Sequence, residues 1–472
     1  MKRFALLPGP LVGALAWLIF DPTMFGASDI SRSGAIVTGL LVWMSIWWVT
    51  QVVDLAITGL LPVIVLTVFN IGSTKEILSP YANDVIFLFA GGCTIGFAIE
   101  RHGLSQRFIS FVLSYLGHSP LRVVAGFLIA TSLMSSCVSN MACAAIMLPM
   151  ASAAIASFAG ISIEKPEHTR AFHNFERAVF LAVGYGASIG GVMTLLGSPP
   201  NPIAAEWLRA NGSNMDFLRW SMIGAPTAIV MMAATFVVFS VVFPMKGLAS
   251  VSISLPVSHA PLTRAAKITI LIFSLAICAW VGSPFLKSWL PNLVLRDGTI
   301  AIAAALLLFI IPEKRGGADA VVPWSQTARL PWGIFVLFGG GLSLADAMQR
   351  TDVSAAIAQS FVGLSAVPAP LLLFTIVISL IFASEIASNT ALTATAVPIV
   401  GAMAPGLGIP TERLVVACAL AASYAFMFPV GTPPNALVFA TGRVPLREML
   451  RVGFVLNLCA AIIITLACLA LA

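Results

Sequence analysis

The sequence predicts an all-α polytopic membrane protein built as an inverted repeat, with two re-entrant helical hairpins, two broken helices and about 11 transmembrane helices. Composition is the first reason. Of the 472 residues, 59% are hydrophobic and 9% are charged, whereas about 25% of a soluble globular chain is charged. The net charge of +6 does not indicate binding to nucleic acid, because Lys and Arg in a membrane protein mark the cytoplasmic side.

The second reason is a set of polar interruptions inside apolar runs, where polar and helix-breaking residues are costly. Two of them are the clusters Ser139-Asn140 and Ser388-Asn389-Thr390. The other two are residues 197–201 and 431–435, which read Gly-Ser-Pro-Pro-Asn and Gly-Thr-Pro-Pro-Asn. Interrupted hydrophobic segments at corresponding places in two halves of a chain indicate a transporter binding site.

The third reason is internal duplication. One offset of 249 positions relates three pairs of landmarks, which are Ser139-Asn140 and Ser388-Asn389, Gly91-Gly92 and Gly340-Gly341, and Pro149 and Pro398. Unrelated apolar helices are not expected to share such an offset. The chain therefore contains two copies of one unit.

The first copy is expected over residues 33–243, after an uncleaved N-terminal span within residues 1–32. Residues 121–159 are too long for one straight span and polar in the middle. They predict a re-entrant hairpin with its tip at Ser139-Asn140. Residues 178–210 are broken by two prolines, which remove backbone donors and disfavour helix before them. They predict two half-helices joined by an unwound link.

The second copy is expected over residues 265–472, after a linker at 244–264. Its hairpin is predicted at about 369–404, with the tip at Ser388-Asn389-Thr390, and its broken helix at about 413–442. Five predicted crossings separate the two hairpin tips. Since five is odd, the hairpins enter the membrane from opposite faces, and the repeats are inverted.

The basic residues give the orientation. With the N-terminus inside, 17 of the 25 Lys and Arg residues fall in cytoplasmic segments, among them a polar loop at 160–177, and 8 fall outside. Cytoplasmic segments carry an excess of Lys and Arg. We therefore expect a multi-pass protein of the cell (inner) membrane, with its N-terminus in the cytoplasm and its C-terminus outside.

The interruptions suit an anion bound together with cations. A broken helix leaves free N–H groups at one half-helix end, which favour anions, and free C=O groups at the other, which favour cations. Ser, Thr and Asn add oxygens that coordinate Na⁺ and groups that donate to a carboxylate. None of the four interruptions contains Lys or Arg, so a bound anion would need co-bound cations to balance its charge.

Each interruption alone has a simpler interpretation. A Ser-Asn pair in a membrane helix is often an interhelical hydrogen-bonding contact, and a Pro-Pro-Asn segment is often a structural kink. Their occurrence twice, at matched places, argues against both interpretations. Glu385, beside the second tip, could be a proton site, a charge that attracts Na⁺ or a buried hydrogen-bonded acid, and we favour a supporting role.

These motifs resemble those of the divalent anion:sodium symporter family, the dicarboxylate and sulfate carriers. The resemblance covers nearly the whole chain and includes the closing segment 431–440, Gly-Thr-Pro-Pro-Asn-Ala-Leu-Val-Phe-Ala. It implies a homodimer in which a transport domain moves against a scaffold as an elevator. Met141 departs from the family pattern, which usually has Thr at this place.

The resemblance also implies the residues of the site. One Na⁺ site would be formed by Ser135, Ser139, Asn140 and the backbone near Gly197. A second Na⁺ site would be formed by Ser384, Asn389 and the backbones of Ala387 and Gly431. The substrate carboxylates would contact Ser139, Asn140, Ser198, Ser388, Asn389, Thr390 and Thr432.

The sequence thus favours a Na⁺-coupled symporter of C4-type dicarboxylates, embedded in membrane lipid. An exchanger, or a carrier of sulfate or another oxyanion on the same fold, is the nearest alternative. An intramembrane enzyme would need a nucleophile, a base or a metal cluster at membrane depth, and no His, paired Asp or Cys-His group occurs there. A channel is also an alternative, but hairpins and broken helices around one central site favour alternating access.

The inverted topology can be tested by labelling. Single cysteines placed at Thr169 and Ser288, in a background without the native cysteines, should react from opposite faces of the membrane. The reason is that the two segments are predicted to lie inside and outside, respectively. A membrane-impermeant maleimide applied to intact and everted vesicles measures this, and labelling of both positions from one face would contradict the inversion.

Overall fold

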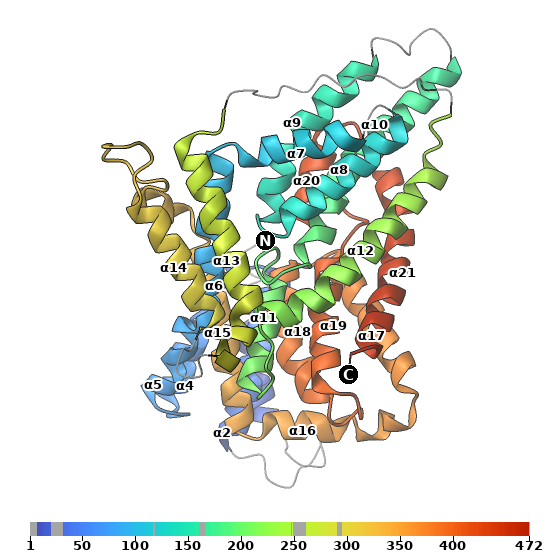
Figure 1. Ribbon diagram of the computed structural model, residues 1–472. Helices are drawn as coiled ribbons and strands as arrows, with labels where there is room; N and C mark the ends of the chain where they lie inside the picture. Colours follow the sequence, from blue (N-terminus) through green and yellow to red (C-terminus); the bar gives the residue numbers. More distant parts are fainter. Residues whose placement is uncertain are drawn as a thin grey trace.

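The computed structural model describes residues 7–19, 32–116, 119–159, 166–246, 248, 261–289 and 295–471. Every regular element in these residues is helical, which confirms the all-α class (Figure 1). The α-helices of the first half are α1 (Pro8–Ile19), α2 (Arg32–Thr50), α3 (Leu55–Gly59), α4 (Leu61–Val68), α5 (Thr74–Leu78), α6 (Asp84–Arg101), α7 (Leu104–Leu116), α8 (Pro120–Ser135), α9 (Asn140–Ala159), α10 (Pro166–Gly191), α11 (Pro200–Ala210) and α12 (Phe217–Val242). Those of the second half are α13 (Arg264–Trp289), α14 (Asp297–Ile310), α15 (Trp332–Arg350), α16 (Val353–Ser360), α17 (Ala369–Ser384), α18 (Asn389–Met403), α19 (Thr411–Ser423), α20 (Pro433–Ala440) and α21 (Leu446–Leu469).

Both predicted hairpins are present. Helices α8 and α9 are joined at residues 136–139, and α17 and α18 are joined at residues 385–388. A proline stands in the first turn of α8 and of α17, where the backbone N–H has no intrahelical partner in any case. The Ser-Asn clusters therefore form the turns at the hairpin tips, as the sequence predicts.

Both broken helices are present as well. Helix α10 stops at Gly191 and α11 starts at Pro200, while α19 stops at Ser423 and α20 starts at Pro433. Helix α10 packs beside α20, and α11 packs beside α19. The two broken helices therefore run antiparallel with their unwound links side by side, as an inverted repeat requires.

One predicted boundary is wrong. The segment 160–177 was expected to be a loop, but helix α10 begins at Pro166 and continues through it. This part of α10 has polar residues but also an inward-facing side. There Phe175 is fully buried and packs against Phe158, with ring centroids 4.6 Å apart. Polar residues on the outer face of a helix that extends beyond the membrane resemble a loop in sequence.

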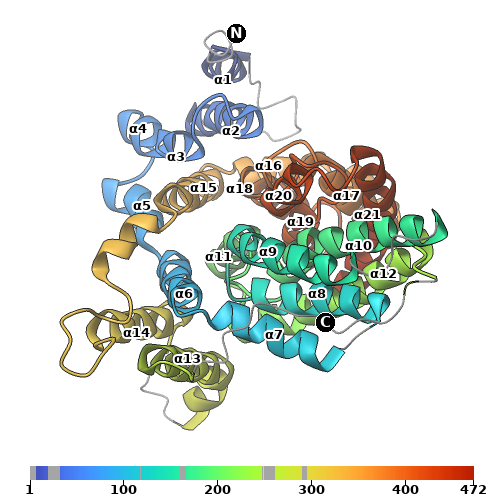
Figure 2. The same cartoon turned by 90° about the horizontal axis from the view of Figure 1, so that it is seen from above.

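The helices form two groups, which Figure 2 shows from above. Helices α1–α6 and α13–α15 form a curved outer layer, which we call the arc. Helices α8–α12 and α17–α21 form a compact group beside it, which we call the inner bundle. Helix α7 leads from the arc into the first hairpin and α16 into the second, and the two lie toward opposite ends of the molecule in Figure 1.

Six helical stretches of the described residues are long and apolar enough to cross a membrane by themselves. Others, such as α8, α14 and α17, are shorter. The predicted number of about 11 crossings therefore stays a prediction, as do the predicted repeat boundaries. Within the described residues the N-terminal span is represented by α1, and most of the linker at 244–264 lies outside them.

Candidate functional site

A cavity of about 820 Å³ lies between the arc and the inner bundle. Both hairpin tips and both unwound links line it, which brings together segments from the two copies. The predicted site residues that line it are Ser139, Asn140, Gly197, Ser198, Ala387, Ser388, Asn389, Thr390, Gly431 and Thr432. Ser135 and Ser384 are fully buried behind its wall.

Oxygen atoms converge beside the first tip. The Ser135 hydroxyl lies 2.6 Å from the amide of Asn140 and 2.7 Å from the carbonyl oxygen of Ala187. The same end of the Asn140 amide lies 3.0 Å from the carbonyl oxygen of Gly197 and 3.1 Å from that of Ala187. If this end is Nδ2, its two hydrogens are shared among the three oxygens. If it is Oδ1, four oxygens face one another, an arrangement that a cation such as Na⁺ stabilises.

Glycine makes this convergence possible. A Cβ on Gly197 would lie 2.6 Å from the carbonyl oxygen of Gly191 and 2.7 Å from that of Ser135. A Cβ on Gly191 would lie 2.5 Å from the Asn140 side chain. Real Cβ atoms do not approach so closely, so the link can touch the tip only because it lacks side chains at these two positions.

The second tip has a related but not identical arrangement. The Oδ1 atom of Asn389 is buried and has no hydrogen-bond partner among the described residues. The Ser384 hydroxyl donates to the carbonyl oxygen of Ile381, 2.7 Å away, and keeps its lone pairs. A buried oxygen without a donor is costly, and a bound cation would satisfy it.

The asparagine of each Pro-Pro-Asn segment holds its link together. The Nδ2 of Asn201 donates to the carbonyl oxygens of Gly191 and Thr194, at 2.8 and 2.7 Å. Asn435 makes the same two bonds to the equivalent carbonyls of the second link, at 2.9 and 3.3 Å. Both asparagines are fully buried. They satisfy carbonyl groups that the helix break leaves free, a role that the sequence analysis did not assign.

Glu385 is a buried acceptor and not a free charge in the cavity. Its Oε1 accepts from the backbone N–H groups of Phe426 and Met427 at 2.7 and 2.8 Å, and from Asn457 Nδ2 at 2.7 Å. Its Oε2 accepts from the N–H of Phe428 at 2.9 Å. The carboxyl group thus ties the second tip to the second link and to α21, which agrees with the supporting role.

The first copy makes the same connection with the roles reversed. Ser136 stands where the second copy has Glu385, and Thr194 stands where it has Phe428. Here the link supplies the side chain, because the Thr194 hydroxyl donates to the backbone carbonyl of Ser136. Each tip is therefore tied to its own link, by an acid in one copy and by a hydroxyl in the other.

The cavity wall offers donors for an anion. Helices α9 and α18 begin at it, and the first residues of a helix present free N–H groups. Helices α11 and α20 also begin at it but add no free N–H groups, because their first turns contain prolines and the N–H groups of Asn201 and Asn435 are bonded to Ser198 and Thr432. Ser388 makes no capping hydrogen bond with its side chain, so its hydroxyl is uncommitted. Met141 also lines the cavity and is 56% exposed. It occupies the position in the first copy that Thr390 occupies in the second, so the first copy lacks the hydroxyl donor that Thr390 provides.

The arc contributes residues that the sequence analysis missed. Gln51, Phe97, Glu100 and Arg329 line the cavity together with the tips. They lie in the first copy and in the segment before α15, and no repeated motif marks them. Glu100 lies at the end of α6 that leads into α7, so the cavity reaches the α7 side of the molecule. The sequence predicts that this side is cytoplasmic.

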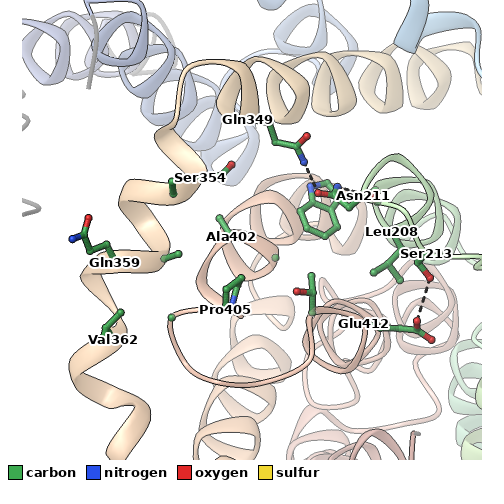
Figure 3. A pocket seen from close by; sticks show the side chains of 16 residues that line it. Leu208, Asn211, Ser213, Gln349, Ser354, Gln359, Val362, Ala402, Pro405 and Glu412 are labelled. Carbon is green, nitrogen blue, oxygen red and sulfur yellow. Dashed lines mark hydrogen bonds between the residues drawn. The ribbon is translucent and has the colours of Figure 1, made fainter. Parts of the chain in front are cut away.

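A second cavity of about 770 Å³ lies on the opposite side, between α11, α16, α18 and α19 (Figure 3). Gln349 donates to Asn211 across its rim, and Ser213 donates to Glu412 at 3.1 Å. Among the described residues, its lining contains one acid, Glu412, no basic residue and none of the predicted site residues. This cavity does not suit an anion.

The sequence of residues 12–471 matches the family described as the sodium:sulfate symporter transmembrane region. The chain belongs to the sodium:sulfate symporter family. Membership confirms the resemblance to the divalent anion:sodium symporters drawn from the motifs. It identifies the chain as a multi-pass membrane transporter with Na⁺ as its coupling ion, and not as an enzyme.

Named relatives agree with this assignment. The symporter is 34% identical over 472 residues to the sodium-dependent dicarboxylate transporter SdcS of Staphylococcus saprophyticus, and the alignment covers 98% of this chain and 89% of the relative. The protein of the same name from Staphylococcus aureus is 34% identical over 474 residues, with 98% and 90% covered. The crystal structure of the YdaH transporter of Alcanivorax borkumensis has a similar fold, with a TM-score of 0.60 and 15% identity over 90% of this chain and 97% of that one.

The Glu385 network makes a testable prediction about stability. Glu385→Gln should lower the midpoint of thermal denaturation in detergent by several degrees, because Gln has one acceptor oxygen where two are used. Each hydrogen bond to a charged group contributes about 1.5–3 kcal/mol. Glu412→Gln is the matched control, since Glu412 pairs with Arg219 and the two side chains are 22% and 44% exposed, so that water screens the pair. Equal midpoints for the two variants would contradict the structural role of Glu385.

Proposed function

We propose that this symporter couples the transport of divalent anions, in the first place C4-type dicarboxylates, to Na⁺. One observation carries the proposal: two hairpin tips and two unwound links, from both copies, line a single cavity. Helix N-termini at its wall suit carboxylates, and the converging oxygens behind it suit Na⁺. The relatives named sodium-dependent dicarboxylate transporters support the same substrate class.

Charge balance explains why the ions would move together. The tips and links contain no Lys or Arg, so a dianion placed among them has only dipoles and hydroxyl groups to stabilise it. We propose one Na⁺ at Ser135, Ser139, Asn140 and Gly197, and another at Ser384, Ala387, Asn389 and Gly431. Each Na⁺ would raise the affinity for the anion, and the anion would raise the affinity for Na⁺ by the same factor.

The two helix groups support an elevator mechanism. All four interrupted elements belong to the inner bundle, whereas Gln51, Glu100 and Arg329 belong to the arc or its loops. We propose that the inner bundle carries the site past the arc, with α7 and α16 as connecting arms. The structure described here would then be the conformation in which the cavity is open to the cytoplasm. The same proposal includes the homodimer that the family resemblance implies.

The coupling proposal predicts the effect of removing an asparagine from either tip. Asn140→Ala and Asn389→Ala should each lower Na⁺-dependent succinate uptake into proteoliposomes by tenfold or more, because each removes a ligand from a buried cation, a loss of about 1.4 kcal/mol or more. Asn211→Ala is the matched control, since Asn211 lies at the other cavity. Full uptake in choline buffer without a proton gradient would refute Na⁺ coupling.

The difference between Met141 and Thr390 predicts an unequal site. Thr390→Val removes a hydroxyl donor and should weaken anion affinity about tenfold, since a hydrogen bond to a charged group contributes about 1.5–3 kcal/mol. Met141→Ala should change only packing, and Met141→Thr should add a donor and favour dicarboxylates. Competition by succinate, malate and sulfate on all three variants measures this. Equal losses for Met141→Ala and Thr390→Val with every anion would show that the site is not asymmetric.

The same panel separates the proposed substrate class from its alternative. Sulfate uptake at the level of succinate, or above it, would make this chain an oxyanion carrier on the same fold. Met141 makes this comparison necessary, because it stands where the family usually has Thr and its thioether donates no hydrogen bond to an anion.

A further inference from the structure

Arg329 is the one basic side chain in the lining of the central cavity among the described residues. It ends a short 3-10 helix, Trp324–Arg329, that leads into α15 of the arc. Its guanidinium lies over the ring of Phe97, 5.1 Å from the centroid, and donates to Gln326 Oε1 at 3.2 Å. These contacts hold the cation at the cavity wall, where the site motifs have none.

The carboxylate partner of Arg329 holds it only loosely. Glu100 also lines the cavity, and the closest approach between the two groups is 3.7 Å. The side chains are 56% and 33% exposed. An ion pair of this length and exposure is weak, because water screens it. The carboxylate of a bound anion can therefore replace Glu100 as the partner of Arg329 with little change in free energy.

Because Arg329 lies on the arc, it can contact an anion on only one side of the membrane. The tips and links belong to the inner bundle, whereas Phe97, Glu100 and Arg329 belong to the arc and its loops. When the inner bundle moves relative to the arc, these three residues stay behind. Arg329 can therefore act on an anion only while the cavity faces the side of α7, and not on the opposite side.

We propose that Arg329 is a one-sided docking residue for the transported anion. A carboxylate that enters or leaves through the α7 side exchanges with Glu100 on the guanidinium, between bulk water and the tips. Glu100 holds the cation in place between transport cycles and limits its affinity for anions. This inference rests on the proposed function, and it assigns to the arc a part in substrate selection that the site motifs do not have.

The experiment compares the two faces of the membrane. Succinate and sulfate transport is measured in everted and in right-side-out vesicles, which present opposite faces of the protein to the added anion. Arg329→Gln should raise KM about fivefold for anion offered to the α7 side, as expected for a partly exposed charge contact, and leave KM on the other side within about twofold. Arg329→Lys should restore most of the affinity, and Glu100→Gln should lower KM on the α7 side alone.

Arg101→Gln is the matched control. Arg101 adjoins Glu100 and pairs with Glu313 at 3.5 Å with similar exposure, but it does not line the cavity, so its KM values should stay at the wild-type level. Equal changes in KM on both faces for Arg329→Gln, no change on either face, or the same change for Arg101→Gln would overturn the inference while leaving the proposed function intact. A wild-type protein that carries neither anion would overturn both.

Discussion

The structure depends on one constraint: a helix that is broken inside a membrane must find partners for every backbone group that it frees. The hydrocarbon core supplies no water for this, so each unsatisfied group that does not face the cavity costs several kcal/mol, and two or three such groups together cost roughly the stability of a small domain. The Asn201 and Asn435 amides bind the freed carbonyls, and the Glu385 carboxyl binds the freed N–H groups of the second link. Without these side chains, the unwound links would not be stable at membrane depth.

This constraint also produces the site. The tips keep groups that the links do not use: free N–H groups at the starts of α9 and α18, and the carbonyl oxygens of Ala187 and Gly197 around the Asn140 amide. Donors and acceptors thus lie in different parts of the site, and the proposed function assigns the donors to the anion and the oxygens to Na⁺. The breaks that make the fold costly are therefore also the source of the groups on which that proposal rests.

The sequence predicted the hairpins, the broken helices and ten of the residues that line the cavity, because Ser-Asn and Pro-Pro-Asn are conspicuous inside apolar runs and occur twice. It could not predict the partners of Glu385, since three of them are backbone N–H groups, which no residue type marks, and the fourth, Asn457, lies 72 positions along the chain. It placed a loop where α10 begins, because polar residues on a protruding helix resemble one. It also missed Glu100 and Arg329, which lie in ordinary polar segments and reach the cavity only through the folding of the arc.

The reversed connection between tip and link has a consequence for the history of the chain. In the first copy a hydroxyl on the link binds the tip, and in the second an acid on the tip binds the link. A protein assembled from two identical copies of the second unit would carry two such buried acids, and one assembled from two first units would carry none. The two halves are therefore complementary parts, since each fastens its tip to its link with a side chain that the other half lacks at that position.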